Sequence, residues 1–213
     1  MAVRAVIFDF NGTLSNDEPI LCEIFRTLFA EHGRPLSTEE YYDRLAGHSD
    51  PEIVRMWLGP EHPDVDKVIA QRTALYVAAV ADGSSVSEDV RDAVRYAAER
   101  VPVAVVSGAA RAEIEPVLEA AGLDTVIRVV VSVDDIANGK PDPEGYLCAR
   151  ELLGRPDPGD VVVVEDTDAG IAAAKSAGMR CIAVLGTLEP ERLAAADEVV
   201  TGLDVALMAR LLG

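Results

Sequence analysis

The stretch Val3-Arg4-Ala5-Val6-Ile7-Phe8-Asp9-Phe10-Asn11-Gly12-Thr13 joins a short apolar run to an aspartate, a glycine turn and a hydroxyl. Such a run predicts a strand buried on both faces of a parallel sheet. Asp9 then lies at the carboxyl end of the strand, where open α/β sheets bind ligands. A carboxylate there can act as a covalent nucleophile through an aspartyl-phosphate. Taken alone, Asn11-Gly12 is also ordinary turn chemistry.

Three further segments continue this pattern in a fixed order along the chain. Ser107-Gly108 follows the apolar run 103–106, Lys140 lies in the segment 138–143 (Asn-Gly-Lys-Pro-Asp-Pro), and Glu165-Asp166 follows the run 161–164. With the pentad at Asp9, the set resembles the haloacid dehalogenase superfamily. The resemblance is to its helical-capped phosphatase and phosphomutase branch, which includes phosphoglycolate phosphatases and β-phosphoglucomutases. It covers essentially all 213 residues.

The periodicity of the chain predicts an α/β fold. Val- and Ile-rich runs at about 3–9, 101–107, 126–133, 161–165 and 181–186 indicate parallel strands, and amphipathic patterns at 86–99, 111–121, 143–153 and 168–177 indicate helices between them. The resemblance implies a Rossmann-like doubly wound core with an inserted α-helical cap. We therefore assign 1–15 and 83–213 to the catalytic core and 16–82 to the cap, with helical segments at about 20–31, 38–45, 51–58 and 65–80.

The composition limits the possible partners. A formal charge of −18 argues against nucleic acid and against anionic membrane surfaces, which bind clustered Lys and Arg. No apolar stretch reaches the length of a membrane span, and the first residues lead directly into a strand, so we expect a cytoplasmic protein. The three cysteines suggest neither a disulfide framework nor a zinc site. The expected partner is a small phosphorylated metabolite, and no obligate protein partner is evident.

The resemblance implies a role for each of these residues. Asp9 would attack phosphorus, and Mg²⁺ would be held by its carboxylate, the backbone carbonyl of Asn11 and the carboxylate of Asp166. Hard oxygen ligands are those that Mg²⁺ prefers. Glu165 would be a further ligand or would orient a metal-bound water.

The same resemblance places two more groups on the phosphoryl oxygens. Ser107 and the backbone at Gly108 would bind these oxygens, and Lys140 would neutralise the charge on Asp9 and the phosphate. Positioning and charge stabilisation are nearly all that phosphoryl transfer requires of a protein. Without the resemblance, Ser107-Gly108 is a strand-to-helix turn and Lys140 a solvated lysine.

Asn11 departs from the family pattern, in which an aspartate two residues after the nucleophile is the usual general acid and base. An amide has no proton to give at neutral pH. Since general acid–base catalysis contributes about 10²–10⁴-fold, ordinary alkyl phosphates are expected to be poor substrates. The enzyme could use good leaving groups, another carboxylate such as Asp17 could substitute, or the chain could bind phosphate with little catalysis. An engineered substitution is a further reading.

The cap segment Leu45-Ala46-Gly47-His48-Ser49-Asp50 resembles the substrate-specificity loop of family phosphomutases. Those loops usually carry an arginine where Asp50 stands, so a bisphosphate or sugar-phosphate mutase is disfavoured. Gly47, His48 and Ser49 are candidate substrate contacts, although His48 is equally well a surface histidine.

Two functions stay open at this point. The first is a Mg²⁺-dependent phosphatase that acts on a small phosphomonoester through Asp9. The second is a catalytically impaired phosphate-binding or regulatory protein on the same scaffold. Dehalogenation is disfavoured because Glu165 and Asp166 indicate a metal, and phosphonate cleavage because the start of the cap shows no lysine for a Schiff base.

Overall fold

A computed structural model describes residues 2–213. Its core is a parallel six-stranded sheet in the order β3-β2-β1-β4-β5-β6. The strands are β1 (Ala5–Phe8), β2 (Val103–Val106), β3 (Val129–Val131), β4 (Val161–Glu165), β5 (Arg180–Val184) and β6 (Glu198–Val200). The predicted α/β fold with a doubly wound parallel sheet is confirmed.

The chain order reverses at β1, which lies between β2 and β4. From β1 the chain builds β2 and β3 on one side, then crosses to β4, β5 and β6 on the other. In open α/β sheets, such a switch point leaves a crevice outside the carboxyl ends of the strands. Asp9, Ser107 and Glu165 lie at the carboxyl ends of the three central strands and therefore share one edge of the sheet.

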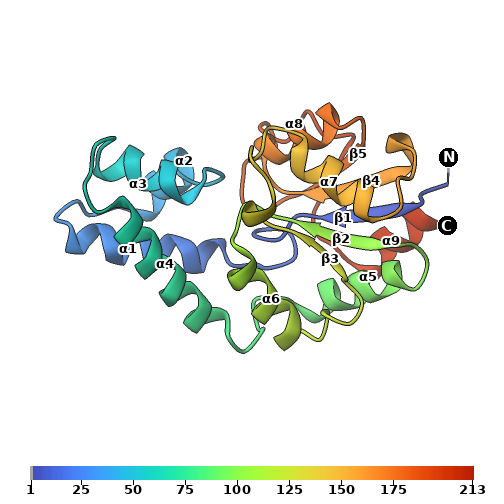
Figure 1. Cartoon of the computed structure of the whole chain (residues 1–213), viewed down its shortest axis with the longest axis horizontal. Helices are drawn as coiled ribbons and strands as arrows, with labels where there is room; N and C mark the ends of the chain where they lie inside the picture. Colours follow the sequence, from blue (N-terminus) through green and yellow to red (C-terminus); the bar gives the residue numbers. More distant parts are fainter. Residues whose placement is uncertain (1) are drawn as a thin grey trace.

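Helices cover both faces of the sheet (Figure 1). On one face are α7 (Glu144–Leu152) and α8 (Asp168–Ser176), and on the other are α5 (Glu88–Ala98), α6 (Arg111–Ala120) and α9 (Val205–Leu212). Two single turns, η1 (Val133–Asp135) and η2 (Pro158–Asp160), complete the core. Right-handed crossovers place helices on one face of the sheet while the chain adds strands on one side of β1. They place helices on the opposite face once the chain adds strands on the other side of β1.

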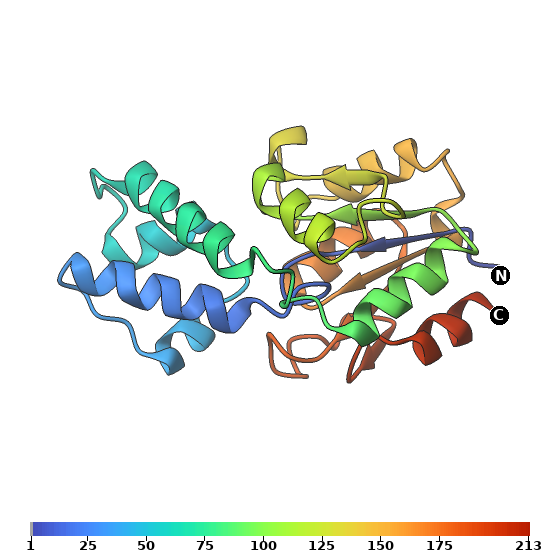
Figure 2. The ribbon, with the colours of Figure 1, turned by 90° about the horizontal axis from the view of Figure 1, so that it is seen from below.

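Four helices lie apart from the sheet, beyond the carboxyl ends of its strands (Figures 1 and 2). They are α1 (Glu18–Glu31), α2 (Thr38–Arg44), α3 (Asp50–Leu58) and α4 (Val65–Val80). Phe25 and Phe29 of α1 lie against each other, and Phe29 stacks on Trp57 of α3. We propose that 16–82 act as a cap over the remaining core.

Two elements near the C-terminus lay outside the predicted pattern. Strand β6 is a three-residue edge strand that is only partly buried, and its sequence Glu198-Val199-Val200 lacks the continuous apolar run that marks the central strands. Helix α9 follows it and packs beside α5. The third predicted strand, at about 126–133, is shorter than expected, because β3 covers only Val129–Val131.

The two linkers between cap and core bind each other. The hydroxyl of Ser15 lies 2.8 Å from that of Ser85, and the amide of Asn16 donates to the carbonyl of Ser85 at 2.8 Å. Both serines are buried. The chain therefore leaves and re-enters the core at one tethered point.

A second contact between cap and core is ionic. Arg72 on α4 pairs with Glu113 on α6, and its Nε lies 3.2 Å from the carboxylate of Asp50 at the start of α3. The side chains of Arg72 and Glu113 are each only 4% exposed. Buried charges are tolerated only when they are paired, so this contact depends on the cap staying against the core.

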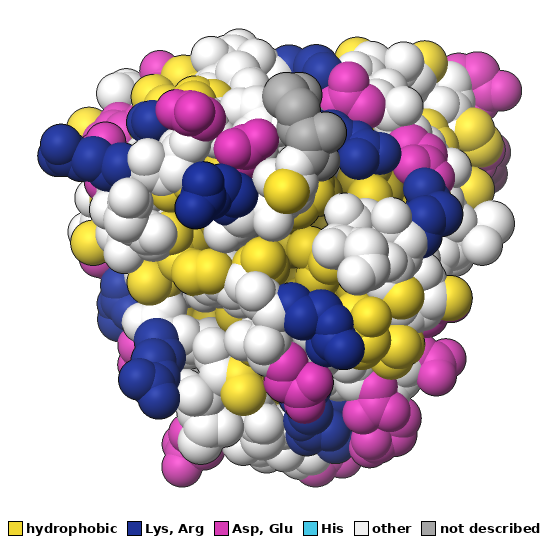
Figure 3. Space-filling model, turned by 90° about the vertical axis from the view of Figure 1, so that its right-hand side faces the viewer, with side chains coloured by type: hydrophobic (Ala, Val, Ile, Leu, Met, Phe, Trp, Pro, Cys, Tyr) yellow, Lys and Arg dark blue, Asp and Glu magenta, His cyan; other side chains and the backbone are white. Residues whose placement is uncertain are grey.

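The face of the core turned away from the cap carries apolar side chains at its centre, with acidic and basic side chains interspersed around them (Figure 3). Both signs of charge occur there, so this face is not a purely acidic surface. Within residues 2–213, none of the helices has the length and apolar character needed to cross a membrane.

The buried ion pair gives a stability prediction. Arg72→Ala leaves the carboxylate of Glu113 buried without its cation, so we expect the free energy of unfolding to fall by about 3–5 kcal/mol in urea denaturation. The control is Arg210→Ala, which removes the more exposed pair with Glu198 and is expected to cost less than about 1 kcal/mol. Equal losses in the two variants would contradict the assignment.

Candidate active site

The register of the central strands brings the first two site residues together. Phe8 of β1 pairs with Val164 of β4, and the amide of Asp9 donates to the carbonyl of Val164 at 2.9 Å. Asp9 and Glu165 therefore lie side by side at the ends of adjacent strands. On the other side of β1, the amide of Ser107 continues the ladder from β2 to the carbonyl of Val131 at 2.9 Å.

Three carboxylates meet at this edge of the sheet. Each of Asp9, Glu165 and Asp166 offers an oxygen within 4.8 Å of the others, and the residues are 6%, 0% and 1% exposed. Carboxylates at this spacing repel one another when all are ionised, and burial increases the cost. The cluster therefore needs cations.

Lys140 supplies one cation from a loop distant in sequence. Its ammonium bonds to Asp9 and lies 2.5 Å from Oε1 of Glu165 and 3.3 Å from the carbonyl oxygen of Val106. Burial by itself would lower the pKa of Lys140, but the pairing with Asp9 and Glu165 raises it above its ordinary value, so the side chain stays charged. The structure thus brings Lys140 to the nucleophile, as the resemblance implies.

The three carboxylates differ in how far nearby cations and hydrogen-bond donors offset their negative charge. Although burial opposes it, Lys140 and the amides of Asp166 and Thr167 hold the pKa of Glu165 below its ordinary value. Burial, reinforced by the charge of Glu165, raises the pKa of Asp9 to about 7 despite its bond to Lys140. Burial and the charges of Asp9 and Glu165 raise the pKa of Asp166 well above its ordinary value.

The negative charge that Lys140 does not offset is suited to binding a divalent cation. Three buried carboxylates face one ammonium, and the two with raised pKa values are the two that the resemblance assigns to metal binding, Asp9 and Asp166. An ion beside them would supply the missing positive charge, and every donor in the set is a hard oxygen of the kind Mg²⁺ prefers.

Glu165 is held in place by a dense set of donors. Oε1 accepts from the hydroxyl of Tyr146 at 2.8 Å, and Oε2 accepts from the amide of Asp166 at 2.8 Å and the hydroxyl of Thr167 at 2.9 Å. Thr167 also caps α8 by accepting from the amide of Gly170 at 3.1 Å. A Cβ on Gly170 would overlap the carboxylate of Glu165, so only glycine fits there.

Asp166 lies against the turn after β1. Its carboxylate accepts from the hydroxyl of Thr13 at 3.3 Å and from the hydroxyl of Thr187. Gly12 has a φ of 76°, and a Cβ there would overlap the carboxylate of Asp166. The glycine of the pentad is therefore needed both for its left-handed backbone and for the close approach of Asp166.

Asn11 has three side-chain partners. Its amide nitrogen donates to Oδ2 of Asp17 at 2.9 Å and lies 3.4 Å from the hydroxyl of Tyr76, and its amide oxygen lies 3.4 Å from the hydroxyl of Ser107. Asp17 also accepts from the hydroxyl of Tyr76 on α4 and from the amide of Gly12 at 3.3 Å. The cap thus reaches Asn11 through Tyr76 and Asp17.

The predicted cap contacts lie less close to this centre. The hydroxyl of Ser49 donates to Glu52 at 2.7 Å in the capping box of α3, and His48 lies 3.9 Å from Glu52 with its side chain 44% exposed. Gly47 comes nearer, because a Cβ on it would lie 3.7 Å from the Thr167 side chain. Gly108 is exposed at the start of the loop after β2.

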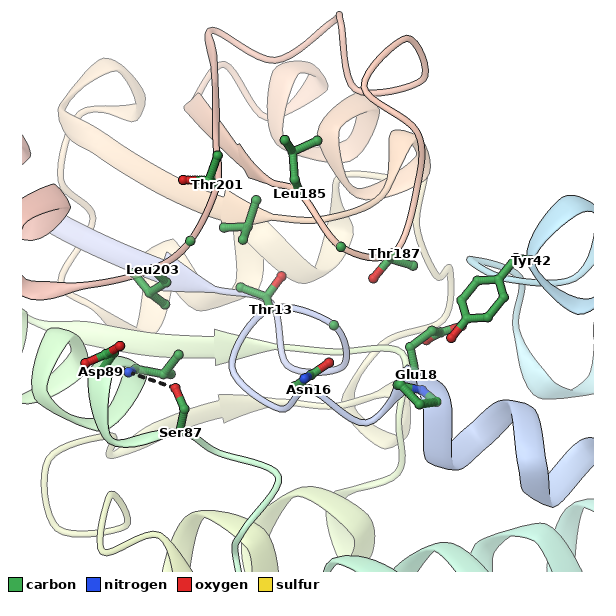
Figure 4. Close-up of a pocket in the computed structure, with 16 residues that line it drawn as sticks. Thr13, Asn16, Glu18, Tyr42, Ser87, Asp89, Leu185, Thr187, Thr201 and Leu203 are labelled. Atoms are coloured by element: carbon green, nitrogen blue, oxygen red, sulfur yellow. Dashed lines mark hydrogen bonds between the residues drawn. The ribbon is translucent and has the colours of Figure 1, made fainter. Parts of the chain in front are cut away.

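A cavity of about 390 Å³ lies between the core and the start of the cap (Figure 4). Thr13 and Thr187, which bond to Asp166, line it from the core, and Glu18 and Tyr42 line it from the cap. The cavity therefore lies where linker, cap and core meet.

Several site residues were not among those predicted. Thr187 follows β5, so its place after an apolar strand was a usable signal. Tyr146, Tyr76 and Thr167 lie in or at the start of helices, where a tyrosine or threonine is indistinguishable from a core or capping residue until the fold places it beside a carboxylate.

The close packing of Gly170 against the carboxylate of Glu165 gives a testable prediction. In Gly170→Ala the new methyl group displaces the carboxylate of Glu165, and with it the salt bridge to Lys140. We expect a lower melting temperature, by several degrees, and weaker Mg²⁺ binding in calorimetry. The control is Gly202→Ala, where a Cβ meets nothing within 4 Å, and unchanged behaviour of both variants would contradict the packing described.

Glu18 provides a pH prediction. Burial, with smaller effects of Asp17 and Asp50, raises its pKa from 4.5 to about 7 against the hydrogen bond from Tyr41 and the charge of Arg72. The folded protein therefore binds this proton more tightly than the unfolded chain, and stability is lost as the pH rises from about 4.5 through about 7. The change is at most about 3 kcal/mol.

We expect Glu18→Gln to remove that part of the pH dependence, since an amide still accepts from Tyr41. Urea unfolding of the metal-free protein between pH 5 and pH 8 measures it, and Glu39→Gln, at an exposed position, is the control. Parallel stability profiles for wild type and Glu18→Gln would show that Glu18 keeps its ordinary pKa.

Comparison with known proteins places this geometry in a family. The family model of haloacid dehalogenase-like hydrolases matches residues 3–178. The chain is 33% identical to validoxylamine A 7'-phosphate phosphatase of Streptomyces hygroscopicus subsp. limoneus over 94% of each protein. It is 32% identical to a phosphorylated carbohydrates phosphatase of Thermotoga maritima over 84% of each.

A solved structure agrees with these relatives. The crystal structure of CbbY from Rhodobacter sphaeroides in complex with phosphate superposes with a TM-score of 0.82 at 26% identity, covering 94% of this chain and 95% of that one. The predicted branch of phosphatases and phosphomutases is thereby confirmed, and with it the enzyme class. The chain belongs to the haloacid dehalogenase-like hydrolases.

Proposed function

We propose that the protein is a Mg²⁺-dependent phosphatase that hydrolyses a small phosphomonoester through an aspartyl-phosphate on Asp9. One observation carries the proposal: Asp9 lies at the carboxyl end of β1 in a buried cluster with Glu165 and Asp166, with the ammonium of Lys140 bonded to it. A nucleophile, a cation on that nucleophile and a set of hard oxygen donors are the parts that phosphoryl transfer needs.

The reaction has two displacements. In the first, an oxygen of the Asp9 carboxylate bonds to phosphorus while the ester P–O bond breaks, and the organic group leaves as an alkoxide or phenoxide, which takes a proton from water. In the second, water attacks the phosphorus of the acyl phosphate, the P–O bond to Asp9 breaks with its electron pair on the restored carboxylate, and inorganic phosphate is released with the proton of the attacking water. Lys140 bonds to Asp9 in the structure, and its positive charge reduces the repulsion between that carboxylate and the phosphate dianion.

Asp9, Asp166 and the backbone carbonyl of Asn11 are the groups that would hold Mg²⁺, with Glu165 beside them. When bound, the ion supplies positive charge for the phosphoryl oxygens and orients the substrate. The chain supports these ligands with Thr13 and Thr187 on Asp166, and with Tyr146, Thr167 and Lys140 on Glu165. The ligand carboxylates are thus held before any ion binds.

The orientation of Asn11 bears on the missing general acid. The amide nitrogen of Asn11 donates to Asp17 and lies 3.4 Å from the hydroxyl of Tyr76, and its amide oxygen turns to Ser107. The donor end of Asn11 is therefore directed to Asp17 and Tyr76. Asp17 bonds to Asn11, Tyr76 and the amide of Gly12, which supports a role in holding the amide.

We therefore propose substrates whose leaving group needs little protonation. Asp50 and Glu113 both engage Arg72, so this arginine is not free to clamp a second phosphate. That supports a monophosphate over a bisphosphate substrate. The relatives named for validoxylamine A 7'-phosphate and for phosphorylated carbohydrates support a small phosphorylated substrate.

The test is hydrolysis of an aryl phosphate and an alkyl phosphate in Mg²⁺ by four proteins: wild type, Asp9→Asn, Asn11→Asp and Gln71→Glu. Gln71 is exposed on α4 and provides an amide-to-acid control. We expect wild type to hydrolyse the aryl phosphate, Asp9→Asn to abolish this activity, and Asn11→Asp to raise alkyl phosphate turnover by about 10²–10⁴-fold. Gln71→Glu should match wild type.

Other outcomes identify the alternatives. Wild type and Asp9→Asn equally silent on both esters, with rescue by Asn11→Asp, would identify a phosphate-binding protein on an intact scaffold. Activity that persists in a chelator would contradict metal dependence. Similar wild-type rates on aryl and alkyl phosphates would mean that another group serves as the acid.

A further inference from the structure

A second group of possible metal ligands lies far from the active site, at the outer end of the cap. His32 is the C-cap residue of α1, and His62 and Asp64 belong to the segment between α3 and α4. Helix α1 begins beside the core and ends at the far end of the cap (Figure 2). Residues thirty positions apart in sequence therefore meet where the cap is most distant from the sheet.

The geometry of this group matches imidazole coordination. The ring centroids of His32 and His62 are 5.2 Å apart, and one donor atom from each of His32, His62 and Asp64 lies within 4.8 Å of the others. Because Zn–N bonds are about 2 Å long, two imidazoles on one tetrahedral ion have ring centres about 5 Å apart. An edge-to-face ring pair has a similar spacing, so the nearby carboxylate is the feature that points to a metal.

We propose that His32, His62 and Asp64 bind a divalent transition ion of the zinc class, with water completing the coordination. Imidazole suits Zn²⁺, Co²⁺ and Ni²⁺, whereas Mg²⁺ prefers oxygen donors only. The site therefore differs in chemistry from the carboxylate cluster around Asp9. The strongly negative net charge of the chain favours cations at both places.

His62 already presents a lone pair at this point. Its Nδ1 accepts a hydrogen bond from the amide of Asp64 at 3.2 Å, so the ring lone pair points toward the residue that carries the third ligand. A metal on this nitrogen replaces one backbone hydrogen bond, and Asp64 is not buried, so its carboxylate has room to turn.

The expected consequence is mechanical. The ion would join the C-terminal end of α1 to the segment that leads into α4. Helices α1 and α4 are the two longest of the cap. Both histidines are only half-buried, so an ion can enter without unfolding the cap. Bound metal should therefore stabilise the cap and leave the Asp9 cluster unaltered.

The experiment is titration of the full chain with Zn²⁺ in excess Mg²⁺, followed by calorimetry and by the melting temperature. The variants are His32→Ala, His62→Ala and Asp64→Asn, and the matched control is His48→Ala, the third histidine of the chain. Asp9→Asn reports on zinc at the catalytic carboxylates. Circular dichroism verifies the fold of each variant. If a histidine variant fails to fold, Asp64→Asn still tests the site.

We expect one Zn²⁺ per chain in wild type, His48→Ala and Asp9→Asn, with a rise in melting temperature. Since loss of a group that merely supports a ligand weakens metal binding about 10–100-fold, loss of His32 or His62 should exceed tenfold, and Asp64→Asn should weaken binding measurably. Co²⁺ in wild type should give the visible absorption of a histidine-ligated site. Affinity unchanged in His32→Ala and His62→Ala, affinity lost in Asp9→Asn, or absence of binding would each overturn the proposal.

Discussion

The ammonium of Lys140 lies between the carboxylates of Asp9 and Glu165, and the active site depends on this pairing. The register of β1 and β4 brings the two acids together, and their burial would otherwise favour the protonated forms. One ammonium offsets only part of the charge of Asp9, Glu165 and Asp166. Burial, reinforced by the remaining negative charge, raises the pKa values of Asp9 and Asp166, and a divalent cation completes the site in our proposal.

The cap contacts the candidate active site and the core through α4. Tyr76 bonds to Asp17, which in turn holds the amide of Asn11, and Arg72 stacks over the ring of Tyr76 while it pairs with Glu113 of the core. One face of a cap helix therefore both closes against the core and orients the residue that departs from the family pattern. The tethered linkers at Ser15 and Ser85 confine the movement available to this helix.

Much of the fold could be predicted because its signals are local. The central strands are continuous apolar runs, and the predicted range of α4 agrees with the structure residue for residue. β6 escaped prediction because an edge strand is partly exposed and needs no apolar run. The site residues after β1, β2 and β4 could be predicted from their position at strand ends. Tyr146 and Tyr76 could not, because only the packing of α7 and α4 brings their hydroxyls to Glu165 and Asp17.

The sequence by itself determined the α/β class, the family resemblance, the carboxylates that we propose as nucleophile and metal ligands, and the absence of an acid at position 11. These follow from residue type and order, which are properties of the chain. The tertiary structure alone decided which way the amide of Asn11 points, that Asp50 pairs with Arg72, and that His32 approaches His62. Each of those depends on contacts between segments distant in sequence, and such contacts exist only after the helices and strands have packed.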